Sequence, residues 1–416
     1  MKTSKTNSIT LANILRFIVG FSVVIIVFQQ LITKALSPSI SNFDEALILF
    51  FFVLSPILII FQRFTTGIYI YTTFSILAII SLLFGKAQPS TSLIQLFIHF
   101  KFFFLFIAFF LLYRSQKGQH QLRSIFNLIV VVTIIGFFIN LFLQEKFFIL
   151  FNTKIEDRGG LLRIFGFQLK PNDLAILLGV HYIYLMSESE DSLSIYKKII
   201  FTFLYGIFIF LNGSRVGLVS IPLALLILST GKARFYSLWA LVGILIITLS
   251  LSLEYFEFLA DQTVKNFGEF KTIEQSQYIR GIMIYYGFVL FIQYFPIGAG
   301  SATFGSVMSF ESPVYVELRL HNMSFFQNLE GIYDSNLATI MGEFGLIGIV
   351  LFAFLWMKIV NESRKLHKTV KNNERYLMAL SIYMLIIILT NPFFMYQYNS
   401  VIFVIALILG PRSSKK

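Results

Sequence analysis

The chain contains no cysteine. Disulfides, thiolate metal sites and cysteine nucleophiles are therefore excluded, and bridges reveal nothing about the redox state of its compartment. Charged residues are also scarce, at 13% of the sequence, whereas 56% of the 416 residues are hydrophobic and 50 are phenylalanine. The core of a soluble domain cannot hide this much apolar surface. The composition predicts an all-α protein that crosses a membrane many times.

The apolar residues fall into thirteen runs, and a spanning helix needs roughly 20 residues to cross about 30 Å of hydrocarbon. The run 281–295 is short and ends at Pro296, so we interpret it as a segment that does not span. The first run follows Lys2 and Lys5 without a small-residue cleavage site, which predicts a retained span rather than a removed signal. The runs are 9–31, 43–62, 66–85, 93–113, 124–143, 172–186, 198–213, 216–230, 235–253, 281–295, 336–360, 376–394 and 396–410.

The distribution of lysine and arginine indicates how the chain is oriented across the membrane. Twelve spans with the amino end in the cytoplasm place most basic residues inside, including the cluster from Lys358 to Arg375, as the positive-inside rule requires. Thirteen spans with the amino end outside satisfy the rule equally well, so charge does not choose between the two arrangements. We attribute the net charge of +12 to topology and anionic lipid head groups and expect no nucleic-acid partner.

The arrangement with about 12 transmembrane helices divides the chain into four parts. Residues 1–143 hold helices 1–5, 144–253 hold helices 6–9 with arginine-bearing external loops, 254–335 form one large extracytoplasmic loop, and 336–416 hold helices 10–12. The run 281–295 then lies in the large loop as an amphipathic or re-entrant helix. The polar residues that this arrangement gathers on the outer face are Arg158, Arg163, Ser214, Arg215, Arg280, His321 and Asp334.

Four segments carry a family resemblance: "RIFGFQLKPNDLA" (163–175), "LNGSRVGL" (211–218), "YIRGIMIYYGFVLFIQYFPIGAGSATFG" (278–305) and "YDSNLATIMGEFGLIGIVLF" (333–352). Their order and spacing resemble the O-antigen polymerase and O-antigen ligase family of bacterial envelope glycosyltransferases. That family shows an Arg before a Pro-Asn pair, a Ser-Arg-x-Gly turn, an Arg upstream of Pro-x-Gly-x-Gly, and a polar residue with Asn before a Gly-rich span. The first five predicted spans are similar to the family only in hydropathy.

The resemblance implies a GT-C-like fold in the bacterial cytoplasmic membrane, with an active site on the extracytoplasmic face, and it selects twelve spans. It also implies a substrate glycan linked to undecaprenyl pyrophosphate, with no metal and no cofactor. Membrane lipid, a chain-length regulator and a flippase are the further partners that it suggests.

Arginines are the candidate pyrophosphate ligands. A guanidinium is always charged and presents a fork of donors that matches phosphate oxygens, as a lysine does not. Arg215 and Arg280 match family positions. Arg163 is the third candidate, and Arg158 is an alternative to it. Each also has a structural interpretation: Arg215 as a hairpin cap that reaches head groups, Arg280 as a solvated loop charge, and the other two as loop residues.

Two polar residues and two glycines accompany these arginines. Ser214 and Asn172 are expected to support the site from the Ser-Arg turn and from the helix start after Pro171. Gly213 and Gly217 flank the turn, and we expect them to let the backbone approach a ligand closely.

Asp334 and His321 are the candidate catalytic bases. Asp334 stands where the ligases of the family carry His, and a carboxylate accepts a hydroxyl proton when burial raises its pKa. Asp334 also suits the N-cap of the helix that follows, and the two roles are compatible. His321 lies in a predicted loop, where a lone His is more often merely exposed.

The replacement of His by Asp334 favours a polymerase over a ligase. A polymerase transfers a growing O-antigen, capsule or exopolysaccharide glycan from its lipid diphosphate to a sugar hydroxyl of another lipid-linked repeat. The alternatives are a ligase, which would pass the finished glycan to lipid A–core or another acceptor, and a flippase or transporter. Transporters usually show two related halves with midplane binding groups, and the chain has no evident internal repeat.

Polar residues inside the other motifs have weaker interpretations. We interpret "GAGSATFG" (298–305) as a flexible turn that accommodates glycan rather than as a nucleotide loop. His99 lies inside a predicted span, where a titratable residue is a functional candidate. Glu343 lies in another, near the outer interface or paired. The sequence does not show their partners.

Overall fold

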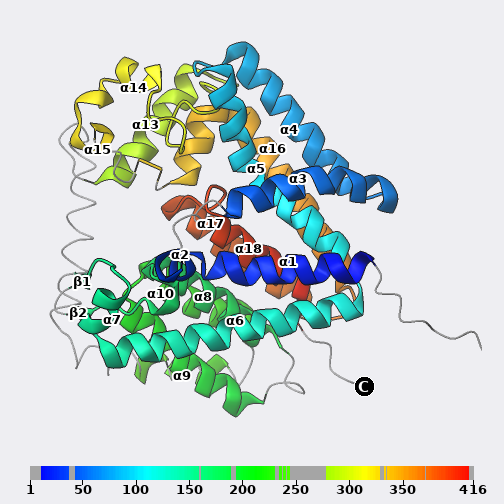
Figure 1. Ribbon diagram of the computed structural model, residues 1–416, viewed down its shortest axis with the longest axis vertical. Helices are drawn as coiled ribbons and strands as arrows, with labels where there is room; N and C mark the ends of the chain where they lie inside the picture. The colour runs from blue at the N-terminus through cyan, green and yellow to red at the C-terminus, as the bar shows by residue number, and fades with distance from the viewer. Residues whose placement is uncertain are drawn as a thin grey trace, which may run out of the picture.

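The computed structural model describes residues 11–36, 43–158, 161–188, 194–229, 234–236, 238–239, 241–243, 278–327, 332–333, 335–370 and 372–411. Helices make up almost all of this part of the chain, as Figure 1 shows. Two very short strands, β1 (Asp157–Arg158) and β2 (Leu161–Leu162), pair as an antiparallel hairpin.

The helices of the amino-terminal half are α1 (Leu11–Val27), α2 (Gln29–Ala35), α3 (Phe43–Gln62), α4 (Thr65–Phe84), α5 (Pro89–Tyr113), α6 (Gln116–Leu143), α7 (Glu145–Leu150), α8 (Pro171–Ser187) and α9 (Ile195–Asn212). Those that follow are α10 (Arg215–Leu228), α13 (Ile279–Gln293), α14 (Pro313–Glu317), α15 (Ser324–Gln327), α16 (Asn336–Leu366), α17 (Asn373–Thr390) and α18 (Gln397–Leu409). Two 3₁₀ turns, Gly166–Gln168 and Leu320–Asn322, lie between these helices.

Within the described residues, 7 helices are long and apolar enough to cross a membrane, namely α3, α4, α5, α6, α9, α16 and α17. The predicted first run does not form one straight helix, because α1 and α2 meet at Phe28 with a bend of 73°. If this bent pair is one span, the number rises to 8. The protein is therefore a multi-pass, all-α membrane protein.

The count among the described residues is smaller than the twelve spans predicted from hydropathy. The helices α8, α10 and α18, with 17, 14 and 13 residues, are shorter than a full crossing requires. The run predicted at 235–253 lies largely outside the described residues. The predicted short helix at 281–295 is present as α13, two residues earlier at both ends, and it packs along α16.

The centre of the molecule is made by α5 and α18. Both helices are apolar over most of their length, as a helix surrounded by other helices requires, and α18 is buried along its whole length. Phenylalanine rings fill the space between α5 and its neighbours: Phe103 stacks on Phe394 with ring centroids 5.5 Å apart, and Phe100 contacts Phe352 at 5.6 Å. The unusually high phenylalanine content thus serves the core.

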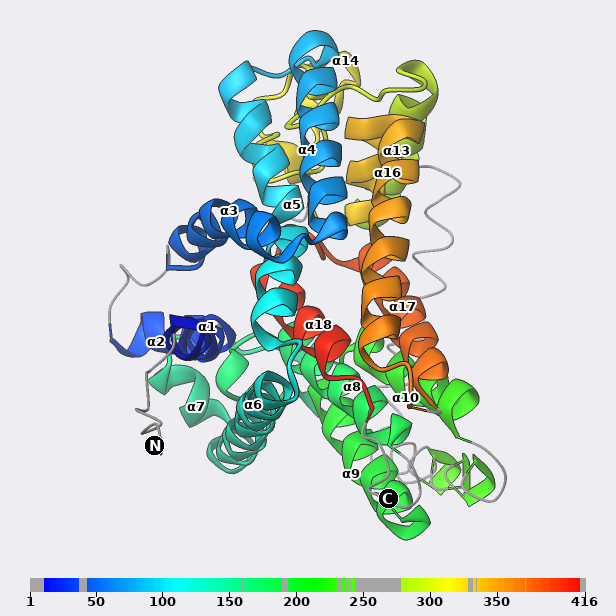
Figure 2. The ribbon, with the colours of Figure 1, turned by 90° about the vertical axis from the view of Figure 1, so that its right-hand side faces the viewer.

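Two groups of helices surround this centre. In Figure 1, α4, α13, α14 and α16 occupy the upper part and α8, α9 and α10 the lower part, with α17 and α18 between them. Figure 2 shows α4 and α16 running along the long axis, whereas Figure 1 shows α1 and α6 running across it.

In the lower group α10 packs closely on α8 at Gly217. A Cβ atom at this glycine would lie only 2.9 Å from the Cβ of Ala175. Gly217 therefore serves helix packing rather than ligand approach.

The segment after α13 binds to a break in α16. Gly345 interrupts α16 with φ 56° and ψ −150°, a backbone conformation that favours glycine. Here the Gly300 N–H donates to the Glu343 carbonyl at 2.8 Å, and the Ile347 N–H donates to the Pro296 carbonyl at 3.2 Å. The segment interpreted as a flexible turn is a buried turn held against α16.

Candidate functional site

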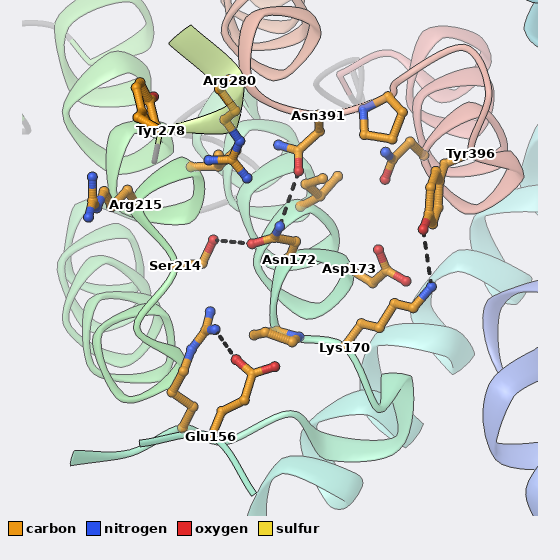
Figure 3. Close-up of a pocket in the computed structure, with 16 residues that line it drawn as sticks. Glu156, Lys170, Asn172, Asp173, Ser214, Arg215, Tyr278, Arg280, Asn391 and Tyr396 are labelled. Carbon is orange, nitrogen blue, oxygen red and sulfur yellow. Dashed lines mark hydrogen bonds and ion pairs between the residues drawn. The ribbon is translucent and has the colours of Figure 1, made fainter. Parts of the chain in front are cut away.

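A cavity of about 550 Å³ lies between the lower helix group and the turn that joins α17 to α18. Its wall is polar and comes from segments far apart in the sequence, as Figure 3 shows. The lining residues are Glu156, Arg163, Lys170, Pro171, Asn172, Asp173, Ile176, Ser214, Arg215, Val216, Tyr278, Arg280, Asn391, Pro392, Tyr396 and Asn399.

Four helices begin at this cavity. The first residues of α8, α10 and α13 line it, and so does Tyr396, the residue before α18. The first backbone N–H groups of a helix have no partner within the helix, and the helix dipole makes that end positive. The wall also carries four basic and two acidic side chains. Both features make the cavity attractive to an anion.

The structure brings three of the four predicted arginines to this cavity. Arg215 is the first residue of α10; its side chain is exposed and makes no hydrogen bond or ion pair with another described residue. Arg280 is half-buried in the first turn of α13. Arg163 is buried and also lines the cavity. Arg158 lies in β1, but its side chain is outside the described part of the structure.

Arg163 is built into the wall. Its Nη1 forms an ion pair with Glu156, and its Nε donates to the carbonyl of Asn212 at 3.1 Å. Asn212 in turn donates its side-chain N–H to the carbonyl of Ile164 at 2.8 Å. Since Glu156 neutralises much of its charge, Arg163 fixes the loop before α8 against the end of α9. Arg163 therefore has a structural role in the wall, and it also lines the cavity.

Ser214 and Asn172 lie together, as Figure 3 shows. The Ser214 hydroxyl donates to Asn172 Oδ1 at 3.1 Å, and Asn172 Nδ2 donates to Asn391 Oδ1 at 3.1 Å. Three turns of the chain are therefore tied together through one asparagine. Gly213 makes the first of these turns, with φ 67° at the end of α9.

Lys170, Asp173 and Tyr396 form a further polar cluster, which the sequence analysis did not single out. Lys170 Nζ donates to Tyr396 Oη at 3.4 Å and lies 4.7 Å from the centroid of its ring. Burial lowers the pKa of Lys170, but attraction to Asp173 and Tyr396 outweighs burial and raises the pKa above its ordinary value. Lys170 is therefore a cation at neutral pH, and Asp173 lies buried beside it (Figure 3).

One more wall residue has an unused hydrogen-bonding atom. Asn399 is buried, and its Oδ1 has no hydrogen-bond partner in the described part of the chain. A buried polar atom without a partner is costly, so such an atom in a cavity wall is typical of a ligand site.

Of the two predicted bases, His321 is in the described part of the chain and Asp334 is not. His321 is exposed in the 3₁₀ turn Leu320–Asn322 and does not line the cavity. Asp334 lies outside the described residues, although Ser335 is described as the N-cap of α16 and accepts from the Ala338 N–H at 3.4 Å. Ser335 is therefore the N-cap residue of α16, which is the structural role predicted for Asp334.

Comparison of the sequence with models of known protein families and with curated proteins finds no match. Among the described residues there is also no group of three or more His, Asp or Glu side chains placed to hold a metal ion. The functional conclusion therefore depends on the residues of the cavity and on the sequence motifs that contribute them.

Proposed function

We propose that the protein is a polysaccharide polymerase. It transfers a glycan from undecaprenyl pyrophosphate to a sugar hydroxyl of another lipid-linked repeat unit, in the synthesis of O-antigen, capsule or exopolysaccharide. The observation that carries this proposal is the convergence of Arg163, Arg215 and Arg280 on one cavity at which four helices begin. These arginines belong to three of the four sequence segments that resemble the polymerase and ligase family.

The cavity offers a diphosphate two kinds of partner. Arg215 and Arg280 supply guanidinium donors that match phosphate oxygens in pairs. The first N–H groups of α8 and α10 add backbone donors with a favourable dipole. When the bond from sugar to diphosphate breaks, negative charge grows on the leaving group, and fixed donors that stabilise this charge lower the barrier. Arg163 holds the wall in place.

A base must accept the proton of the attacking hydroxyl. Asp334 and His321 remain the candidates that the sequence motifs nominate. Asp173 is a further candidate, because it is a buried carboxylate in the cavity wall. Glu156 is less suited to this role, since Arg163 already binds it.

The proposal includes a topology of twelve spans in the bacterial cytoplasmic membrane, with the amino end in the cytoplasm and the cavity facing outward. A flippase would then deliver the substrate and a chain-length regulator would set its final length. The chain has no cysteine of its own, so single cysteines report the sides directly. We expect a membrane-impermeant maleimide to label Glu311→Cys in intact cells and Lys365→Cys only after permeabilisation. Labelling of both residues from the same side would contradict twelve spans.

The experiment that tests the activity is the glycan profile of cells lacking the protein, with lipid-linked material separated from surface polysaccharide. Single repeats without a ladder are the expected result. Long chains retained on the lipid carrier would indicate a ligase. Repeats trapped on the cytoplasmic face would indicate a flippase and would remove the diphosphate role from Arg215.

A further inference from the structure

A second cavity, of about 440 Å³, adjoins the first. Lys170, Asp173 and Tyr396 line both cavities and form the boundary between them. Residues at the bend between α1 and α2 and at the start of α18 also line it. The other residues that line the second cavity are Ile26, Val27, Gln29, Gln30, Thr33, Lys34, Gln168, Gln397 and Tyr398.

The chemistry of the second cavity differs from that of the first. Its wall is made mainly of neutral amides, hydroxyls and aromatic or aliphatic side chains, and it contains no arginine. Its cations are Lys34, whose Nζ also donates to the carbonyl of Asn152 at 2.6 Å, and Lys170 at the boundary. A diphosphate would therefore find two cationic side chains here and no guanidinium, against four cationic side chains, three of them arginines, in the first cavity.

Several polar atoms are buried in this wall without a hydrogen-bond partner in the described chain. Gln397 is 4% exposed, yet neither its Oε1 nor its Nε2 has a partner. The Tyr398 hydroxyl and Gln168 Oε1 are likewise buried and unpartnered. Each such atom costs stability unless something binds it. Together they offer both donors and acceptors to a ligand that carries many hydroxyl groups.

We propose that this second cavity binds an uncharged saccharide, which is the acceptor end of the incoming repeat unit. This assignment rests on the proposed polymerase function. A polyprenyl chain would leave the buried amide of Gln397 unsatisfied, whereas vicinal sugar hydroxyls satisfy both of its ends. The aromatic ring of Tyr396 at the boundary and the aliphatic side chains of Ile26 and Val27 provide apolar surface for the faces of a sugar ring.

The two cavities then bring the reacting atoms together beside Asp173. The acceptor hydroxyl oxygen forms a bond to the anomeric carbon of the donor as the bond from that carbon to the diphosphate oxygen breaks. The electron pair of the broken bond leaves with the diphosphate, which Arg215 and Arg280 hold. The hydroxyl proton passes to the carboxylate of Asp173.

The test uses the full chain in lipid nanodiscs and two separate probes. One probe is the oligosaccharide released by mild acid from lipid-linked repeats of cells lacking the protein, and the other is undecaprenyl pyrophosphate. We expect Gln397→Leu to weaken saccharide binding at least tenfold and to leave diphosphate binding unchanged. The same variant should melt at a higher temperature without ligand, because leucine removes the unpartnered buried amide. Gln293→Leu, at an exposed glutamine of α13, is the matched control and should change neither affinity.

Tyr398→Phe removes a single hydroxyl and keeps the test valid if Gln397→Leu does not fold. Saccharide affinity unchanged in both variants would overturn the assignment, as would saccharide binding that disappears in Arg215→Ala. Diphosphate binding without any saccharide binding would refute the second cavity alone. Failure to bind either probe would refute the proposed polymerase function itself.

Discussion

His99 and Glu343 lie 244 positions apart in sequence, and His99 Nε2 approaches Glu343 Oε2 to 2.9 Å in the interior of the molecule. Both side chains are fully buried, so α5 and α16 are joined by a polar contact inside an apolar environment. The other carboxylate oxygen, Glu343 Oε1, accepts from the Thr303 and Phe304 N–H groups at 3.0 and 3.2 Å and from the Ser306 hydroxyl. Glu343 therefore holds the segment after α13 in place.

Removing this carboxylate should destabilise the protein. We expect Glu343→Ala to lower the free energy of unfolding by about 3 kcal/mol, because it leaves His99 and two backbone N–H groups buried without their acceptor. Thermal unfolding of the purified protein in detergent measures the effect. Glu374→Ala is the control: its side chain is 79% exposed and lies 3.8 Å from Arg364, so its loss should cost less than about 1 kcal/mol. Equal effects in the two variants would contradict the anchoring role of Glu343.

Stability and activity should fall in proportion to the number of hydrogen bonds that a substitution at Asn172 or Ser214 removes. Asn172→Ala removes two of them and Ser214→Ala removes one, so we expect losses of about 2 and about 1 kcal/mol in stability. Activity should fall in the same order, because the turn that carries Arg215 is no longer fixed to the start of α8. Polymer length on a gel and thermal unfolding provide the two measurements. A larger defect in Ser214→Ala than in Asn172→Ala would refute the central position of the asparagine.

Arg215 should matter for activity and not for stability. Arg215→Lys keeps the charge but loses the fork of donors, and we expect roughly 100-fold less polymer with unchanged protein level and melting temperature. The side chain is exposed and makes no bond to another described residue, so folding does not depend on it. Arg375→Lys, at an exposed position of α17, is the matched control. Normal polymer from Arg215→Lys at normal protein level would remove the diphosphate role.

Asp173 should affect the chemical step. We expect Asp173→Asn to lower the rate of glycan transfer by a factor of roughly 100 to 10,000, since the amide cannot accept the hydroxyl proton. Affinities for the saccharide and diphosphate probes should stay within a few fold. Glu156→Gln changes the other carboxylate of the first cavity and should cause a much smaller loss of rate. Near-normal transfer by Asp173→Asn would show that another residue accepts the proton.

The bases nominated by the sequence motifs are tested in the same transfer assay. We expect Asp334→Asn to be more damaging than His321→Ala, because His321 is exposed and lies away from the cavity wall. The opposite order would move the base to His321. A loss in Asp334→Asn together with normal transfer by Asp173→Asn would place the base at Asp334.

Much of the helical layout is visible in the sequence because hydropathy marks it. The runs predicted at 43–62, 66–85 and 93–113 correspond closely to α3, α4 and α5. The break at Phe28 was not visible, since no Pro or Gly marks it. The bend carries α2 onto the 3₁₀ turn Gly166–Gln168, which is a tertiary contact that local sequence does not record.

In the candidate site, too, the sequence predicts some residues and not others. Arg163, Arg215 and Arg280 were identified because short motifs surround them, and the structure places all three at one cavity. Lys170 and Asp173 flank the Pro-Asn pair, so two opposite charges at the start of an apolar run were an available signal. The pairing of His99 with Glu343 was not available, because it depends on which helices pack together.

The bonds from Ser214 to Asn172 and from Asn172 to Asn391 join the ends of helices and not their apolar bodies. Helices adjust to bilayers of different thickness by tilting, and tilt moves their ends relative to one another unless the ends are fixed together. Because these bonds join the turns before α8, between α9 and α10, and after α17, we expect the three turns to keep their relative positions when the helices tilt. The start of α10, which carries Arg215, should then stay at the same distance from the start of α8 in bilayers of different lipid composition.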